Sequence, residues 1–460
     1  MAEKLPKSFI FGVATSAFQI EGGYNQPDGP KNNWFDWERN GKVEPSGEAA
    51  RFWTNWLHYV ELASKLGIDS FRISIEWSRI MPEENFIDAQ AIKRYKEILQ
   101  TIKEFSMQPL ITLHHFCHPY RYGEDFWLRQ DCAHIFSEWV KLAVDNFGDY
   151  CSTWITINEP NILPSGSYLF GIFPPGKIAD LKSTLICYDN LLSAHIKSYE
   201  VIKTQDPKSV ISTNVSSSSL YEFERMATDI LLSKLFIENA NEVPTFLQDK
   251  RHEFYTKLGR SNLLEHFLRF IYKAPLDLTQ LFKETKKAMF SSSYEKFLDV
   301  IQIDFYNPWA YSHLRLPFHK TAGGRFLLPA RALWDDLVDP ESFLKFIEIS
   351  YVNGLGLWVV ENGLCNRVKN GRSFQRLDGW TRPMLFKHYL PKLIEARNRN
   401  INVTGYWHWS LMDNYEWGSY EPRFGIYGID RQRDIKVLET DSMGYDAASS
   451  YKEMINSLRQ

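Results

Sequence analysis

Two glutamates, Glu159 and Glu361, stand where short apolar runs of the chain end. Glu159 lies in the segment TINEP and Glu361 in VVENG, so a chain-breaking proline or glycine follows each closely. Two carboxyl groups that flank one bond can hydrolyse a glycoside, because one protonates the leaving oxygen and the other lies opposite it. A single glutamate at the end of a strand is usually solvated. The prediction therefore depends on whether the fold brings the two together.

The pattern of apolar residues predicts elements that would do so. Short apolar runs alternate with longer amphipathic stretches, as in parallel strands joined by helices. We expect strands at Phe9–Ala14, Ser70–Ile75, Pro109–Leu113, Thr153–Ile157, Val210–Asn214, Val300–Phe305, Gly356–Val360 and Val403–Trp407, and helices that include Phe52–Leu66, Ala89–Phe105, Ile135–Phe147 and Leu185–Thr204. Eight strand–helix units predict an α/β fold, a closed (β/α)8 TIM barrel with its chemistry at the strand C-termini.

In such a barrel Glu159 and Glu361 end the fourth and seventh strands, which face each other across the mouth. An open, doubly wound sheet is the structural alternative, but no G-x-G-x-x-G follows the first strand to bind a dinucleotide. Because α/β barrels run as one domain well past 250 residues, we expect residues 1–460 to form a single catalytic domain.

The connection from Ser216 to Lys296 is much longer than the others. It holds helical patterns at Thr228–Asn239 and Leu263–Phe270, and we expect it to cover the barrel mouth as an elaborated loop.

The composition excludes several classes of function. A net charge of -3 with scattered basic residues gives no reason to expect nucleic acid or an anionic membrane as partner. We find neither a run of about 20 apolar residues for a membrane span nor a signal peptide. The five cysteines are odd in number and include no C-x-x-C pair, which favours a reducing cytoplasm. The 15 Trp and 23 Tyr could stack on sugar rings as well as fill a core. The oligomeric state is left open.

Six segments of the chain, in order, resemble glycoside hydrolase family 1, the β-glucosidase family. They are FGVATSAFQIEGG at Phe11–Gly23, FRISIEWSRI at Phe71–Ile80, TLHHF at Thr112–Phe116, TINEP at Thr156–Pro160, VVENG at Val359–Gly363 and WSLMDNYEW at Trp409–Trp417. The resemblance runs from about Phe9 to Asp430 and implies a retaining β-glycosidase that needs no cofactor and no metal. Its partner would be a small-molecule β-glycoside.

The resemblance also implies roles for individual residues. Glu159 matches the acid/base and Glu361 the nucleophile. Arg72 and Tyr306 match the residues that hold the nucleophile's carboxylate, and the substrate-binding positions are matched by Gln19, His115, Asn158, Trp334, Trp409, Glu416 and Trp417. Among these, Asn158 would bind the sugar 2-OH, Trp409 would lie beneath the ring, and Trp334 would stand at the aglycone side.

Simple electrostatics agrees with this division of roles. The permanent charge of Arg72 should keep Glu361 ionised, whereas Glu159 has no such partner in its motif and should stay protonated. Glu416 would accept hydrogen bonds from two sugar hydroxyls and, if ionised, would repel a 6-phosphate. We therefore expect neutral β-glucosides as substrates, rather than their 6-phosphates.

Two positions depart from the family pattern. Asp304-Phe305-Tyr306 replaces the usual Asn-Tyr-Tyr, which adds a carboxyl group near the site and puts the local hydrogen bonding and pH optimum in doubt. His115-Phe116 replaces the usual His-Trp, which removes an indole donor and puts affinity at the sugar 3-position in doubt.

Several alternatives stay open. A β-galactosidase, a β-fucosidase or a transglycosylating enzyme would share this fold, and the aglycone and linkage are not indicated. A non-catalytic sugar-binding barrel belongs to another class, although such relatives typically lack one of the two carboxylates. The cluster His114-His115-x-x-His118 suggests a metal-dependent hydrolase, but His114 and His115 should point to opposite sides of a strand and leave too few ligands together.

Overall fold

The barrel strands form where the sequence is apolar enough to be buried on both faces, as parallel sheets require. The computed structural model describes residues 4–218, 220–258, 282–306, 334, 336 and 338–459. The barrel strands are β1 (Ile10–Ala14), β2 (Ser70–Ser74), β3 (Gln108–Thr112), β4 (Thr153–Ile155), β5 (Val210–Ser212), β6 (Asn214–Ser216), β7 (Val300–Phe305), β8 (Gly356–Asn362) and β11 (Val403–Trp409). Every residue of β2 and β7 is buried.

All these strands pair in parallel, in the order β5-β4-β3-β2-β1-β11-β8-β7-β6. The two ends of this order, β5 and β6, are one stretch of chain interrupted only at Thr213. The sheet therefore closes on itself, and the predicted (β/α)8 barrel is confirmed. The predicted strand Val210–Asn214 is correct in position, but it is two short strands that pair with different neighbours.

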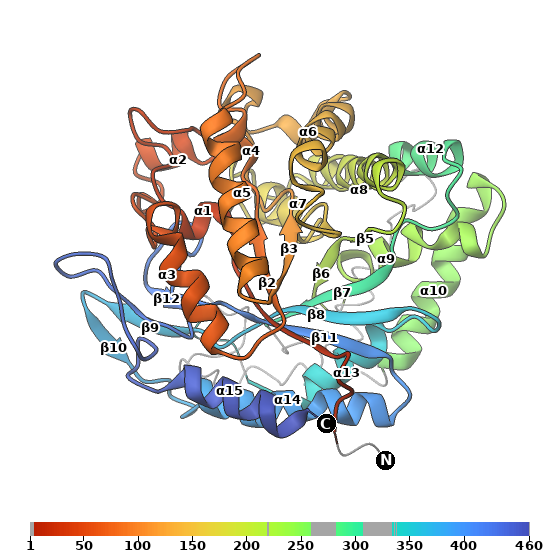
Figure 1. Ribbon diagram of the computed structural model, residues 1–460. Coiled ribbons are helices and arrows are strands. Elements are labelled where there is room, and N and C mark those ends of the chain that lie inside the picture. Colours follow the sequence, from red (N-terminus) through yellow and green to blue (C-terminus); the bar gives the residue numbers. More distant parts are fainter. Residues whose placement is uncertain are drawn as a thin grey trace.

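Helices surround the barrel in Figure 1, in the connections between its strands and after the last one. They are α3 (Phe52–Lys65), α5 (Ala89–Glu104), α6 (Cys132–Phe147), α8 (Leu181–Gln205), α9 (Arg225–Leu231), α10 (Val243–Leu258), α12 (Lys283–Ser291), α13 (Pro340–Ser350), α14 (Arg382–Asn398) and α15 (Ala447–Leu458). Helix α5 shows why they form: Asp88 caps its first turn, and Ala91, Tyr95, Ile98 and Ile102 bury one face at three- and four-residue spacing.

Shorter helices and strands lie in the loops. They are α1 (Ala17–Ile20), α2 (Phe35–Arg39), α4 (Trp77–Ile80), α7 (Ile162–Pro164), β9 (Asn366–Lys369), β10 (Arg372–Phe374), β12 (Pro422–Arg423), β13 (Ile429–Asp430) and β14 (Lys436–Val437). The strands β9, β10 and β12 form a small antiparallel sheet beside the barrel (Figure 1).

The long connection after β6 differs from its prediction. The pattern at Thr228–Asn239 begins earlier, as α9 from Arg225, and ends at Leu231. The pattern at Leu263–Phe270 lies outside the described residues. Helix α10 was not predicted. That the connection covers the barrel mouth stays a prediction.

Strand side chains alternate between two apolar clusters. Trp358 and Trp407 belong to a small cluster of strand residues, while their neighbours Leu357 and Tyr406 pack in the large one beneath the helices. This period of two places one set of side chains inside the barrel and the other outside it. At the C-terminal ends of the strands, polar residues continue this inward-facing set of side chains, and they form the candidate site described below.

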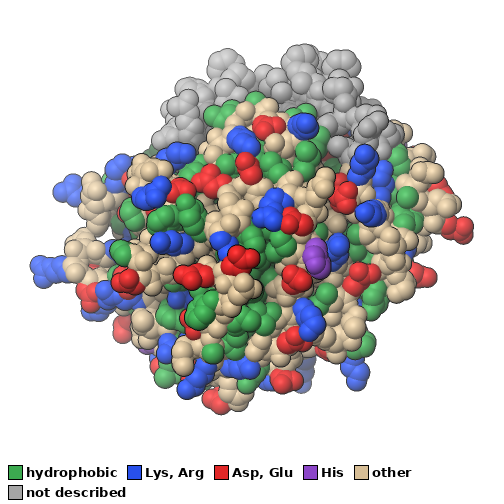
Figure 2. Space-filling view, turned by 90° about the horizontal axis from the view of Figure 1, so that it is seen from above, with side chains coloured by type: hydrophobic (Ala, Val, Ile, Leu, Met, Phe, Trp, Pro, Cys, Tyr) green, Lys and Arg blue, Asp and Glu red, His purple; other side chains and the backbone are tan. Residues whose placement is uncertain are grey.

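The surface carries no single-sign patch on the face shown in Figure 2, where acidic and basic side chains are interspersed. No helix within the described ranges is long and apolar enough to cross a membrane. The two chain ends lie together, since the Leu5 amide donates to the Leu458 carbonyl at 2.7 Å (Figure 1).

Candidate active site

Glu361, near the end of β8, has a partner for each carboxylate oxygen. Arg72 of β2 donates from Nη1 to Oε1 at 2.6 Å, and Tyr306, just beyond β7, donates its hydroxyl to Oε2 at 2.7 Å. The Arg72 side chain is fully buried and the Glu361 side chain is 5% exposed. Removing one member of a buried pair leaves an uncompensated charge and costs about 3–5 kcal/mol. The pair therefore fixes the position of this carboxylate.

Arg72 also hydrogen-bonds to residues at or just beyond the ends of β3 and β4. Its Nε donates to Thr112 Oγ1 at 3.0 Å, and its Nη2 donates to Asn158 Oδ1 at 2.6 Å. Asn214 donates to the same Asn158 oxygen at 2.8 Å. Thr112 and Asn214 were not predicted as site residues. Their position at strand ends was the only signal that could have pointed to them.

Glu159 is only 7% exposed, and Arg72 lies near it without forming an ion pair with it. Its backbone has φ 40°, the left-handed region that a non-glycine residue occupies at a cost of about 1–3 kcal/mol. The surrounding packing holds this strained turn, and such strain concentrates at functional sites. Trp417 adopts a similar φ of 46°.

The two glutamates meet in one buried centre together with Asp304. Single oxygens of Glu159, Asp304 and Glu361 lie within 4.8 Å of one another. An inverting glycosidase needs carboxyl groups about 6.5–9.5 Å apart to leave room for a water, whereas a retaining one holds them about 5–5.5 Å apart. The geometry fits the shorter class.

Burial raises the pKa of both glutamates, but the groups that surround them differ. Burial raises the pKa of Glu159 to about 8, and the nearby Glu361 carboxylate adds to this shift. Burial also raises the pKa of Glu361 above its ordinary value, but Arg72 and Tyr306 oppose that rise. Arg72 thus favours the ionised nucleophile as expected, although it does not fully cancel the effect of burial.

The candidate sugar-binding residues converge beside this centre. Gln19 of α1 donates to Glu416 at 2.8 Å. The ring of His115 stacks on Trp409 and on Trp417, with centroids 5.7 Å away in both cases. The structure therefore brings together residues from opposite ends of the chain.

Polar atoms in this group have no hydrogen-bond partner among the described residues. They include Gln19 Oε1, His115 Nδ1 and Asn158 Nδ2, all buried. An unsatisfied buried polar atom costs about 1–3 kcal/mol, so native proteins rarely keep one without a reason. Both donor and acceptor capacity is left free, and the hydroxyl groups of a sugar could use it.

Two further aromatic residues pack against members of this group. Phe116, which replaces the family's Trp, packs its ring 5.0 Å from Trp417 and is 3% exposed. Trp334 is partly buried against the cluster that contains Trp409, and Arg367 lies 4.7 Å over its ring.

Burial also raises the pKa of Glu416 to about 8, with a further contribution from the Glu361 carboxylate. This shift favours the protonated form of Glu416 near neutral pH. Gln19 opposes the shift by donating to the carboxylate, and hydroxyl donors of a ligand would act in the same direction.

The histidine cluster does not assemble a metal site in the described part of the chain. His114 Nε2 accepts from Trp127 at 3.3 Å, His118 Nε2 lies 2.9 Å from the Gly123 carbonyl, and His115 stacks on tryptophans. Among described residues, the group close enough to share a metal consists of the three carboxyl groups Glu159, Asp304 and Glu361.

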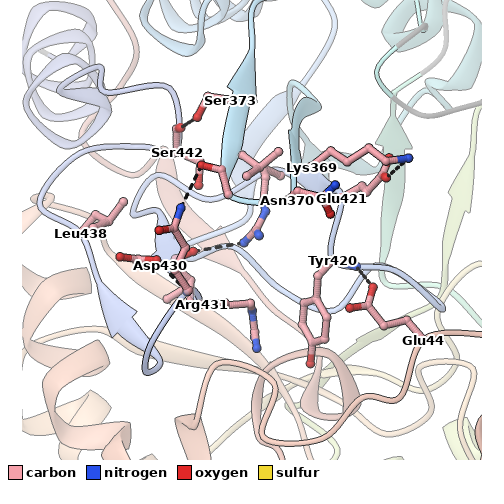
Figure 3. Close-up of a pocket in the computed structure, with 15 residues that line it drawn as sticks. Glu44, Lys369, Asn370, Ser373, Tyr420, Glu421, Asp430, Arg431, Leu438 and Ser442 are labelled. Atoms are coloured by element: carbon pink, nitrogen blue, oxygen red, sulfur yellow. Dashed lines mark hydrogen bonds and ion pairs between the residues drawn. The ribbon is translucent and has the colours of Figure 1, made fainter.

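A cavity of about 620 Å³, lined by other residues, lies between β9–β10 and the segments around β12 and β13 (Figure 3). Its charged lining residues comprise Lys369, Arg423, Arg431, Glu44, Glu421 and Asp430. Lys369 pairs with Glu421 at 2.9 Å, and Glu44 accepts from the Tyr420 amide at 3.0 Å. The opposite charges balance, so the cavity does not indicate a charged ligand.

Comparison with known proteins agrees with the geometry. The profile described as Glycosyl hydrolase family 1 matches residues 1–457. A 1,4-beta-D-glucan glucohydrolase of Thermotoga neapolitana is 26% identical over 452 residues, covering 96% of this chain and 97% of that protein. A 6-phospho-beta-galactosidase of Clostridium acetobutylicum is 24% identical over 469 residues and covers 98% of both chains.

A family 1 β-glucosidase of Thermotoga maritima, solved in complex with isofagomine lactam, shares the fold with a TM-score of 0.75. The alignment covers 100% of both chains at 21% identity. Together with the paired glutamates in the barrel mouth, these matches establish that the chain is a glycoside hydrolase and belongs to glycosyl hydrolase family 1.

Proposed function

We propose that this enzyme hydrolyses terminal β-D-glucosyl residues of neutral β-glucosides or short oligosaccharides, with retention at the anomeric carbon. One observation carries the proposal: Glu159 and Glu361 share a buried centre, and among the described residues Glu361, but not Glu159, has a cation and a phenol on its carboxylate. That asymmetry supports Glu361 as nucleophile and Glu159 as acid/base.

Two steps follow from these roles. In the first, a Glu361 oxygen bonds to the anomeric carbon while the bond to the leaving oxygen breaks, and Glu159 gives that oxygen its proton. In the second, Glu159 takes a proton from water, whose oxygen attacks the anomeric carbon and releases Glu361. The configuration inverts twice and is retained.

The remaining expected residues are proposed as the sugar site. The free amide hydrogens of Asn158 support a contact with the 2-OH, which would strengthen in the transition state. Gln19, His115 and Glu416 would bind the other hydroxyls, with Trp409 beneath the ring. Trp417 would complete the sugar site, and Trp334 would stand at the aglycone side. The domain assignment, residues 1–460 as one catalytic unit, is part of the proposal, as is a reducing cytoplasmic location, which five buried free cysteines support.

Retention is tested by following an aryl β-glucoside by proton NMR. We expect β-glucose to form first and the α-anomer to appear only through mutarotation, which a blank of pure β-glucose calibrates. Initial α-glucose would contradict the two-step mechanism. A survey of aryl galactosides, fucosides and added alcohols would separate the related activities, including transglycosylation.

Cleavage of 6-phosphoglycosides is the second candidate, because 6-phospho-beta-galactosidases are among the relatives. Glu416 argues against it, since neither its neutral nor its ionised form supplies the positive charge that a phosphate needs. Because the raised pKa weakens the expected repulsion, discrimination against a phosphate rests mainly on the positive charge that Glu416 does not supply. We expect nitrophenyl β-glucoside to be cleaved faster than its 6-phosphate, and the reverse order would refute the assignment.

A further inference from the structure

We propose that Asp304 is a positioning residue whose carboxyl group shares a proton with Glu159 and supplies it to the acid/base glutamate as the pH rises. This inference rests on the proposed function. Asp304 is one of the two departures from the family pattern, and its side chain is fully buried.

The strand register places Asp304 at the catalytic centre. Pairing between β7 and β8 shifts after Ile303 and Val359, so Asp304 lies opposite Glu361 rather than Val360. On its other side Asp304 lies opposite Ser216 of β6. Ser216, Asp304 and Glu361 thus form a row across three neighbouring strands.

The contacts of Asp304 leave one oxygen available for Glu159. Asn214 donates to Oδ2, while Oδ1 is buried and has no hydrogen-bond partner in the ranges described. Glu159 is its neighbour, since oxygens of both residues belong to the 4.8 Å group, and a hydrogen bond from a protonated Asp304 lowers the pKa at which Glu159 would lose the first proton of the pair. Two carboxyl oxygens side by side need a proton between them to avoid repulsion.

The charges around Asp304 require that proton. The titratable and polar groups that face it are Glu361 on β8, Glu159 after β4, Arg72 on β2, Tyr306 after β7, and Asn214 and Ser216 on β6. Together with Asp304 itself they comprise one cation and three carboxyl groups. If Arg72 pairs with an ionised Glu361, any further ionisation leaves an excess negative charge in a buried site. Burial, Glu361 and Glu159 together raise the pKa of Asp304 well above its ordinary value.

Glu159 and Asp304 therefore hold two protons in the free enzyme and lose them in two coupled steps. When the first proton leaves, the second stays between the two oxygens and can reside on Glu159. Its loss requires two adjacent carboxylates and so occurs at higher pH. An asparagine at position 304 has no titratable proton, so Glu159 would titrate alone and at lower pH.

The test is the pH dependence of kcat/KM for Asp304→Asn, which keeps the oxygen that accepts from Asn214. With a poor leaving group such as 4-methoxyphenyl, we expect the basic limb of the pH profile to shift to lower pH by at least about one unit, which is the coupling expected of such a pair. With 2,4-dinitrophenyl β-glucoside, which needs little protonation, it should hardly move. Asp299→Asn, at the opposite end of the barrel beside Lys203, is the matched control and should leave the profile unchanged.

An unchanged limb in Asp304→Asn, or an equal shift with both substrates, would overturn the proposal. If Asp304→Asn fails to fold, Asp304→Ser also removes the carboxyl group and carries the same expectation. Infrared spectroscopy gives a second readout without turnover: near neutral pH the protonated carboxyl band of the wild type should be stronger than that of the variant, and equal spectra would refute the shared proton. A wild type that cleaves no β-glucoside would instead refute the proposed function.

Discussion

The end of β8 and the end of β4 present the same side chain in two different surroundings. Glu361 has an arginine and a tyrosine on its two oxygens, whereas Glu159 has no ion-pair partner in the part of the chain that the structure describes and lies on a strained turn. Both are buried, so burial alone cannot separate them. Their difference comes from the neighbours that other strands supply, and it suits one carboxylate for nucleophilic attack and the other for proton transfer.

The largest expected effect is at the β8 end. Glu361→Ala should abolish turnover of every substrate, because no glycosyl-enzyme can form. Loss of a nucleophile in a covalent mechanism costs on the order of 10⁶-fold in kcat. Steady-state hydrolysis of nitrophenyl and dinitrophenyl glucosides measures this, with circular dichroism to confirm folding. A variant that kept a tenth of the activity would reverse the assignment.

Replacement of Glu159 should have a smaller and more selective effect. Glu159→Ala should lose about 10²–10⁴-fold in kcat/KM with poor leaving groups, and little with dinitrophenolate, which departs without a proton. In the wild type, activity on poor leaving groups should fall as the pH rises past about 8, where the buried Glu159 loses its proton. Equal losses on both substrate kinds would contradict its role as acid.

Arg72→Met tests the cause of the asymmetry. An opposite charge within about 4–6 Å lowers a carboxyl pKa by about 1–3 units, so its removal should raise the pKa of Glu361 by a similar amount. Because Glu361 must be ionised to attack, the acidic limb of kcat/KM should move to higher pH. Arg72→Lys, which keeps a charge, is the matched control and should restore part of the limb. A limb that stays in place would show that Arg72 only supports the fold.

Tyr306→Phe should have the smallest effect of the four. It removes one hydrogen bond to a charged group, worth about 1.5–3 kcal/mol, which corresponds to roughly 10- to 100-fold in kcat/KM. The pKa of Glu361 should rise here too, because the phenol favours the carboxylate. A loss larger than that of Arg72→Met would mean that the phenol, rather than the guanidinium, dominates the β8 end.

The sequence by itself determined the barrel and the two glutamates. Eight apolar runs alternate with amphipathic stretches, and this local period predicts strands and helices whatever their partners are. Glu159 and Glu361 could be named because each ends a strand, and because the matching segments carry their roles. The long connection after β6 was poorly predicted, since packing rather than local pattern decides where α9 begins and ends.

Only the tertiary structure decided the state of the charges. The register shift that sets Asp304 beside Glu361, and the burial that raises the pKa of Glu416 to about 8, depend on contacts between residues far apart in the chain. The sequence names a carboxyl group, but its protonation is set by the number of charges and the amount of water that the fold leaves around it.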